Sequence, residues 1–214
     1  MGLVVFGVGT FAQVVARYVG DVDAYTVDAD YIQALELDYK PVIPFEEVHL
    51  VYPPSEYDMF VAVTQQNGHR DLLERKVQAA WDLGYHTPSL SFRPEMVSVT
   101  VKYGQNCLIS PGAIVEPFTT IGNGVFVRSG VYVGHHCTVR DFAYIAPRAS
   151  IAGHVDVGAG AFIGNNATIR DRVTIGHHAV IGCGAVVLRD VKPYEVYRGY
   201  PARLLSISGE DIEI

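Results

Sequence analysis

The densest group of titratable side chains lies between Gly134 and Pro147, where the chain reads GHHCTVRDFAYIAP. This segment holds the adjacent histidines His135 and His136, followed by Cys137 and Tyr144. Imidazole has an unperturbed pKa of about 6.5, so it can take a proton near neutral pH, and a well-placed general base typically gives about 10² to 10⁴ in rate. A solvated histidine at a chain turn is an equal alternative on residue type alone. Cys137 could act as a nucleophile, but its place in the repeat described next predicts an inert, buried thiol.

A six-residue repeat fills the second half of the chain and has to position this segment. Sixteen consecutive hexads run from Val97 to Lys192. Fifteen begin with Val or Ile, Tyr103 being the exception, and the fifth position is always Ala, Val, Cys or Thr. Such spacing suits short strands that meet at tight corners around a narrow core. Glycine occupies the second position seven times, where we expect the missing Cβ to let the chain turn sharply. The repeat predicts a parallel β-helix, because a sandwich would show turn signals about every 8 to 12 residues.

The first ninety residues show the start of a nucleotide-binding α/β fold. An apolar run ends in a turn in which Gly7, Gly9 and Ala12 match G-x-G-x-x-A, and Asp28 follows the next apolar run. The N–H groups at the start of a helix can bind a phosphate, and an acid at this spacing suits ribose hydroxyls. Glycines that merely allow a tight strand-to-helix turn are an equal alternative.

A third apolar run, Met59 to Val63, leads to an amphipathic helix from Leu72 to Trp81. The expected order is β-α-β-α-β. This is half of a doubly wound dinucleotide fold, so a complete NAD-binding domain would not fit, which argues against an oxidoreductase. We expect domains at 1–90, 91–192 and 193–214, with the last segment leaving the β-helix as a tail.

Composition narrows the classes of partner. The formal net charge is −7 and no basic run is present, which argues against nucleic acid. Hydrophobic residues make up 49% and charged residues 18% of the chain, which indicates folded domains. No membrane span or signal peptide is expected, since the N-terminal apolar run breaks at glycines. Three cysteines without a C-x-x-C pair favour the reducing cytoplasm.

The hexads resemble those of the hexapeptide-repeat acyltransferases. This resemblance implies a left-handed β-helix with three hexads per coil, a homotrimer, and acyl-CoA bound in the groove between neighbouring subunits. Together with the N-terminal half-Rossmann domain, the repeat gives the chain a closer resemblance to one family of this group, the NeuD-like sugar acyltransferases. That family includes sialic acid O-acetyltransferases and bacillosamine-pathway nucleotide-aminosugar N-acetyltransferases.

The segment around His135 resembles the active-site signature of this family, which implies that His135 is the catalytic base. The carboxylate that commonly follows the base is His136 here, and Tyr144 stands where the family has a second histidine. The N–H of Gly153, one coil beyond His135, is implied to stabilise the oxyanion. Thr10 and Phe11 replace the Gly-His that is common in the glycine turn.

The resemblance also implies two sets of binding residues. Contacts to the sugar nucleotide are expected from Gly9, Thr10, Phe11, Asp28, Thr64, Arg70 and Tyr144. Contacts to the CoA co-substrate are expected from Gly153, Asn166, Gly184, Arg198 and Arg203.

The implied activity is direct transfer of an acyl group, with acetyl-CoA as the expected co-substrate, to the amine of a nucleotide-linked amino sugar for a bacterial surface glycan such as lipopolysaccharide. O-acetylation of a sugar hydroxyl is the main alternative. A non-catalytic binder of sugar nucleotides is a further hypothesis, because His136 replaces the usual carboxylate. The zinc-dependent γ-carbonic anhydrases share the repeat, but their His-x-x-x-x-His spacing does not occur among the repeat histidines, so no metal is expected.

Overall fold

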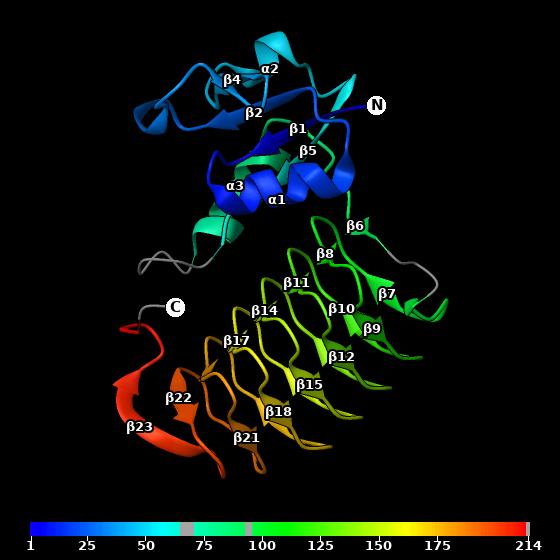
Figure 1. The fold of residues 1–214 in the computed structure, drawn as a ribbon, viewed down its shortest axis with the longest axis vertical. Helices are drawn as coiled ribbons and strands as arrows, with labels where there is room; N and C mark the ends of the chain where they lie inside the picture. The colour runs from blue at the N-terminus through cyan, green and yellow to red at the C-terminus, as the bar shows by residue number, and fades with distance from the viewer. Residues whose placement is uncertain (65–70, 93–95, 213–214) are drawn as a thin grey trace. The chain divides into compact units, whose positions relative to one another are not determined.

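The computed structural model describes residues 1–64, 71–92 and 96–212 (Figure 1). These residues form two compact units that follow one another along the chain, with the boundary between Pro88 and Ser89. Within the described residues, no helix is both long enough and apolar enough to cross a membrane.

The first unit is built on a five-stranded sheet with the order β3-β4-β2-β1-β5. Four strands are parallel, and β3 pairs with β4 in the antiparallel sense. The strands are β1 (Gly2–Phe6), β2 (Ala24–Val27), β3 (Glu36–Leu37), β4 (Lys40–Pro44) and β5 (Tyr57–Val61). The helical segments are α1 (Thr10–Val19), the 3₁₀ turn Ala29–Tyr31, α2 (Val48–Val51) and α3 (Leu72–Asp82). The predicted α/β unit is confirmed, with the β3–β4 hairpin as an addition.

Both long helices bury an apolar stripe. Helix α1 buries Ala12, Val15 and Ala16, and α3 buries a stripe at the same three-to-four-residue spacing. Helix α1 ends at Gly20, whose φ of +88° is a conformation that glycine adopts at little cost. The central strand β1 carries no polar side chain and its neighbour β2 is buried along its whole length, as expected for parallel strands that are covered on both faces.

The second unit is a parallel β-helix of two-residue strands that form three sheets. Between Leu90 and Val187, each strand pairs with a strand eighteen residues away, as in Thr120↔Thr138, Phe126↔Tyr144 and Tyr132↔Ser150. One coil therefore consists of three hexads, as the resemblance implied. Figure 1 shows four strands of one sheet stacked in a column: β8 (Leu108–Ile109), β11 (Phe126–Val127), β14 (Tyr144–Ile145) and β17 (Phe162–Ile163).

From Lys102 to Val187 the strands of the β-helix start every six residues, and one strand precedes and two follow this run. They are β6 (Leu90–Ser91), β7 (Lys102–Tyr103), β8 (Leu108–Ile109), β9 (Ile114–Val115), β10 (Thr120–Ile121), β11 (Phe126–Val127), β12 (Tyr132–Val133), β13 (Thr138–Val139), β14 (Tyr144–Ile145), β15 (Ser150–Ile151), β16 (Asp156–Val157), β17 (Phe162–Ile163), β18 (Thr168–Ile169), β19 (Thr174–Ile175), β20 (Val180–Ile181), β21 (Val186–Val187), β22 (Glu195–Arg198) and β23 (Arg203–Ser208).

The core of the β-helix contains the first and fifth positions of the hexads. Ile151 and Ile163 from the first position and Ala161 and Ala167 from the fifth are fully buried. Large β-branched residues thus alternate with small ones inside a narrow triangle, which is the packing that the repeat predicts.

The glycines at the second position have a different role from the one expected. They do not make the sharp corners, because none of them has a positive φ. A Cβ on Gly164 would lie 2.6 Å from the backbone oxygen of Ile181, in the next coil, so glycine is needed for close stacking. The corners are made at the fourth hexad position, where the left-handed region is occupied by glycines such as Gly160 and by non-glycine residues such as His136 at φ +56° and His154 at φ +59°.

The C-terminal segment also differs from the expectation that it leaves the β-helix. Strand β22 continues the eight-stranded sheet beside β20, and β23 folds back on β22 in the antiparallel sense. The hexad pattern ends at Lys192, but the backbone pairing continues because a strand needs only a free sheet edge, whatever its side chains.

Candidate active site

Three histidines meet at one corner of the β-helix, and we call His135, His136 and His154 the histidine corner. The first two lie in the turn between β12 and β13, and His154 lies one coil later. Two backbone hydrogen bonds align these turns: the N–H of His136 donates to the carbonyl of Pro117 at 3.1 Å, and the N–H of His154 donates to the carbonyl of His135 at 2.9 Å. The hydrogen-bonded coils thereby fix the backbone positions from which the three imidazole side chains extend.

The rings of the histidine corner interact directly. Nδ1 of His135 lies 3.0 Å from Nδ1 of His136, so one of these nitrogens donates and the other accepts. If His135 donates, its Nε2 keeps a lone pair and can act as a base. His136 stacks on His154 with ring centroids 5.0 Å apart and is covered on another side by Phe118 at 4.8 Å. His136 can therefore orient His135 in the way that the usual carboxylate would.

Gly153 lies directly against the ring of His135. A Cβ at this position would be 2.8 Å from Cε1 and 2.9 Å from Nε2 of His135, so only glycine accepts the ring in this place. Within the described part of the chain, the N–H of Gly153 donates no hydrogen bond. The corner thus places a potential base beside a potential donor for a developing oxyanion.

The charges around the histidine corner are mixed. A carboxylate oxygen of Glu116 accepts a hydrogen bond from the backbone N–H of His135 at 3.1 Å. The pKa of His154 is lowered, first by partial desolvation and then by the positive charge of Arg172 and by its two histidine neighbours. Lowering this pKa favours the neutral imidazole near pH 7.

A second histidine pair, His177 and His178, occupies the corner between β19 and β20. Its rings repeat the edge-to-face arrangement, with centroids 5.9 Å apart, and Tyr194 stacks on His178 at 5.4 Å as His154 stacks on His136. Here Pro193 precedes the stacked residue, where the histidine corner has Gly153. A proline has no N–H, so the second pair lacks the donor that accompanies His135.

Cys137 is buried under the histidine corner, as its hexad position predicts. Its Sγ lies 3.1 Å from the carbonyl oxygen of Ala152, and burial raises the pKa of the thiol. A buried thiol with a raised pKa is a poor nucleophile.

Tyr144 lies away from the histidine corner within a single chain. It belongs to β14 of the eight-stranded sheet. His135 instead lies in the turn between β12 and β13, which belong to the two five-stranded sheets of the β-helix. Its hydroxyl accepts a hydrogen bond from Nη1 of Arg128 at 2.7 Å, its ring stacks on Phe162, and burial raises its pKa. The structure does not bring Tyr144 and His135 together in one protomer.

The glycine turn of the first unit gives different roles to its two glycines. Gly7 has a φ of +122°, and a Cβ there would lie 2.9 Å from the carbonyl oxygen of Ala62, so this glycine serves packing. Gly9 caps α1, and a Cβ there would meet nothing within 4 Å. The exposed N-terminus of α1, with Thr10 and Phe11 in its first turn, therefore has room for a ligand.

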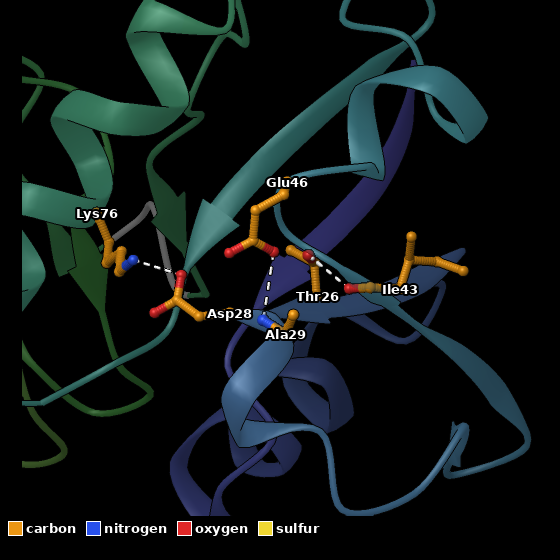
Figure 2. Close-up of polar contacts among 6 residues, drawn as sticks. All are labelled: Thr26, Asp28, Ala29, Ile43, Glu46 and Lys76. Atoms are coloured by element: carbon orange, nitrogen blue, oxygen red, sulfur yellow. Dashed lines mark hydrogen bonds and ion pairs between the residues drawn. The ribbon is translucent and has the colours of Figure 1, made fainter.

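Asp28 follows β2 and is held by a residue that sequence reasoning missed. Lys76 of α3 donates to Oδ1 of Asp28 at 2.5 Å (Figure 2). Its ammonium group also lies 5.3 Å from the ring centre of Phe6. Lys76 lies on α3 between the buried residues Leu73 and Val77, and this position in the sequence could have indicated a partly buried lysine that needs an acidic partner.

Two further contacts fix the backbone beside Asp28. A carboxylate oxygen of Glu46 accepts from the N–H of Ala29 at 3.2 Å, and the hydroxyl of Thr26 donates to the carbonyl of Ile43 (Figure 2). Thr64 is half-buried just after β5. Arg70, the last residue expected to bind the sugar nucleotide, lies outside the described residues.

The residues expected to bind CoA form two groups in the β-helix. Asn166 and Gly184 lie one coil apart at a third corner, both with positive φ, and the N–H of Asn166 donates to the carbonyl of Pro147. Arg198 and Arg203 are direct partners across the β22–β23 hairpin. Two neighbouring guanidinium groups can bind one phosphate group together.

Comparison with known proteins agrees with the fold. The family model described as bacterial transferase hexapeptide (six repeats) matches residues 104–135, 136–171 and 154–189. A mutant of perosamine N-acetyltransferase from Caulobacter crescentus, in complex with CoA and GDP-perosamine, is 27% identical, with a TM-score of 0.86 over 96% of this chain and 97% of that chain. A search of curated proteins found no significant match.

Two further solved structures cover nearly the whole chain. The acetyltransferase domain of PglB from Neisseria gonorrhoeae FA1090, in complex with acetyl coenzyme A, is 28% identical, with a TM-score of 0.84 over 95% of this chain and 98% of that chain. WeeI from Acinetobacter baumannii AYE is 22% identical, with a TM-score of 0.78 over 96% of this chain and 100% of that chain, and supports the fold alone.

Fold and site together define a hexapeptide-repeat acyltransferase with an N-terminal α/β unit and a left-handed β-helix. The match of the hexapeptide model within residues 104–189, and the overlap of nearly the whole chain with a perosamine N-acetyltransferase and an acetyltransferase domain, agree with the resemblance to the NeuD-like sugar acyltransferases.

Proposed function

We propose that the protein is an acetyl-CoA-dependent N-acyltransferase that modifies the amine of a nucleotide-linked amino sugar for a bacterial surface glycan. The observation that carries the proposal is His135 lying against Gly153 in a chain whose whole length resembles a nucleotide-sugar N-acetyltransferase. The complexes of similar proteins with CoA, acetyl coenzyme A and GDP-perosamine support the two substrate classes. Three free thiols support a reducing, cytoplasmic setting.

In the proposed reaction, the sugar amine attacks the thioester carbonyl directly. Nε2 of His135 takes the proton of the amine as the C–N bond forms, and the same proton then goes to the departing CoA sulfur. The N–H of Gly153 stabilises the oxyanion, and a single donor of this kind is typically worth about 3 to 4 kcal/mol. No enzyme-bound acyl group forms, which agrees with the buried, unreactive state of Cys137.

His136 is the proposed orienting residue for the base. A neutral His136 accepts the Nδ1–H of His135 and leaves Nε2 of His135 free to face the substrate.

The substrates are assigned to separate groups of residues. We propose that Gly9, Thr10, Phe11, Asp28, Thr64 and Arg70 bind the nucleotide of the sugar. Asn166, Gly184, Arg198 and Arg203 are proposed to bind CoA. A homotrimer would add residues of a neighbouring subunit, Tyr144 among them, to each active site.

The decisive experiment measures release of CoA thiol from acetyl-CoA with a panel of UDP-, dTDP- and GDP-linked amino sugars. Release is expected only with an amine acceptor, and His135→Ala should lower the turnover number at least about 10²-fold. His177→Ala is the matched control and should keep wild-type turnover. Release with hydroxyl acceptors alone would replace the proposal with O-acetylation, and unchanged turnover of His135→Ala would remove His135 from its role.

A further inference from the structure

The histidine corner brings three imidazoles within reach of one ion. One ring nitrogen from each of His135, His136 and His154 lies within 4.8 Å of the others, and all three side chains are exposed. The linear sequence hides this cluster, since the histidines are one, eighteen and nineteen residues apart. Because residues eighteen apart in the sequence stack on one another in successive coils, these three histidines become neighbours in space.

The geometry is close to that of a tetrahedral zinc site. Zn²⁺ binds imidazole nitrogen at about 2.0 to 2.1 Å, which puts two nitrogens of a tetrahedral site about 3.3 Å apart. The Nδ1 atoms of His135 and His136 are already 3.0 Å apart. A ring nitrogen of His154 lies within 4.8 Å of both, and its exposed side chain is free to turn toward the same point.

The backbone at the corner makes the arrangement rigid. The turns that carry the histidines are bonded to the neighbouring coils, so binding requires ordering of rings but not of chain. A three-histidine site leaves a fourth position for water or another small ligand.

We propose that His135, His136 and His154 form a binding site for a divalent transition-metal ion that prefers imidazole, with Zn²⁺ as the representative ion. An ion at this site occupies the lone pair of His135 and therefore inhibits proton transfer. The inhibitory part rests on the proposed acyltransferase function, whereas the binding part stands on the geometry alone.

The second histidine pair offers a matched comparison within the same chain. His177 and His178 have the same edge-to-face arrangement, but the residue stacked on them is Tyr194, whose neutral phenol is a far weaker ligand than imidazole. Two imidazoles without a third hold Zn²⁺ weakly, so the second pair should contribute little.

The test uses full-length protein without a polyhistidine tag, freed of metal by EDTA and desalted. Zn²⁺ binding is measured by calorimetry, and Co²⁺ binding by the visible absorption of the bound ion. Wild type and His177→Asn should bind one ion per chain with the same affinity. His154→Asn should bind at least about tenfold more weakly, because even the outer partners of metal ligands are typically worth about 10- to 100-fold.

Two results would overturn the site: no saturable binding by the wild type, or equal affinities of wild type and His154→Asn. A separate assay tests inhibition. Zn²⁺ should suppress CoA release, EDTA should restore it, and His154→Asn should need at least about tenfold more Zn²⁺ for the same suppression. Unchanged or stimulated release at saturating Zn²⁺ would contradict the inhibitory role. If no acceptor supports CoA release at all, the proposed function fails while the binding measurements still decide the site.

Discussion

The histidine corner and the second histidine pair share their sequence pattern and differ in the coil beneath them. Both start from Gly-His-His, both pairs of rings meet edge to face, and both second histidines are stacked on a ring from the next coil. The next coil supplies Gly153 and His154 in one case and Pro193 and Tyr194 in the other. A histidine pair is therefore not a site by itself, since the adjacent coil decides whether a donor and a third imidazole accompany it.

The largest effect is expected from giving the histidine corner the proline of the second pair. Gly153→Pro removes the N–H that is proposed to hold the oxyanion and fills the space beneath His135, so the turnover number should fall about 10²- to 10³-fold. The fold should tolerate the change, because Pro193 occupies the equivalent place at the other corner. CoA release measures the effect, and thermal unfolding checks the fold.

Gly153→Ala separates the two roles of this glycine. It keeps the N–H, but its Cβ meets the ring of His135, so turnover should lie between the values for wild type and Gly153→Pro. A folded Gly153→Pro enzyme with wild-type turnover would show that the two corners differ for another reason.

A smaller effect is expected when His136 loses its ring. His136→Ala removes the acceptor for Nδ1–H of His135 and should lower turnover about tenfold, within the range typical of residues that orient a functional histidine. His136→Asn offers an amide oxygen as acceptor and tolerates the positive φ at this position, so it should recover most of the activity. Equal losses in both variants would argue that His136 acts by packing alone.

A different kind of effect is expected from the first unit. Asp28→Ala should raise the KM for the sugar nucleotide several-fold and leave the turnover number nearly unchanged, because the proposed contact is to the nucleotide and not to the reacting atoms. Steady-state kinetics with the sugar nucleotide as the varied substrate measures both constants. Lys76→Met, which removes the ion pair that holds Asp28, is the companion variant and should shift KM in the same direction. An unchanged KM in both would leave the first unit without a part in binding.

Much of the β-helix could be predicted from the sequence, because its period is short and strict. The eighteen-residue coil places Gly153 beside His135 and His154 beside His136, as the eighteen-residue separation of each pair in the sequence predicts. The same arithmetic could have separated Tyr144 from His135, since nine residues are half a coil.

Other features depend on contacts that no local pattern encodes. The β3–β4 hairpin was not predicted, and the two prolines of β4, Pro41 and Pro44, are of a residue type that usually argues against a strand. The pairing of Lys76 with Asp28 joins elements that lie far apart in the chain. The convergence of three histidines escaped a search for metal ligands by linear spacing, since a coil of the β-helix separates them.

The smallest effect is expected from Cys137, which differs from Ala179 at the equivalent hexad position of the second pair. Cys137→Ala makes the core beneath the two corners alike and removes only a buried sulfur, so the free energy of unfolding should fall by about 1 kcal/mol. Turnover should stay at the wild-type level, because direct transfer uses no thiol. Iodoacetamide should modify the exposed Cys183 in the native protein and leave Cys137 unmodified, since burial raises the pKa of the Cys137 thiol and blocks access. Loss of CoA release in Cys137→Ala, with the fold intact, would instead indicate an acyl-cysteine intermediate and would place the chemistry inside the β-helix core.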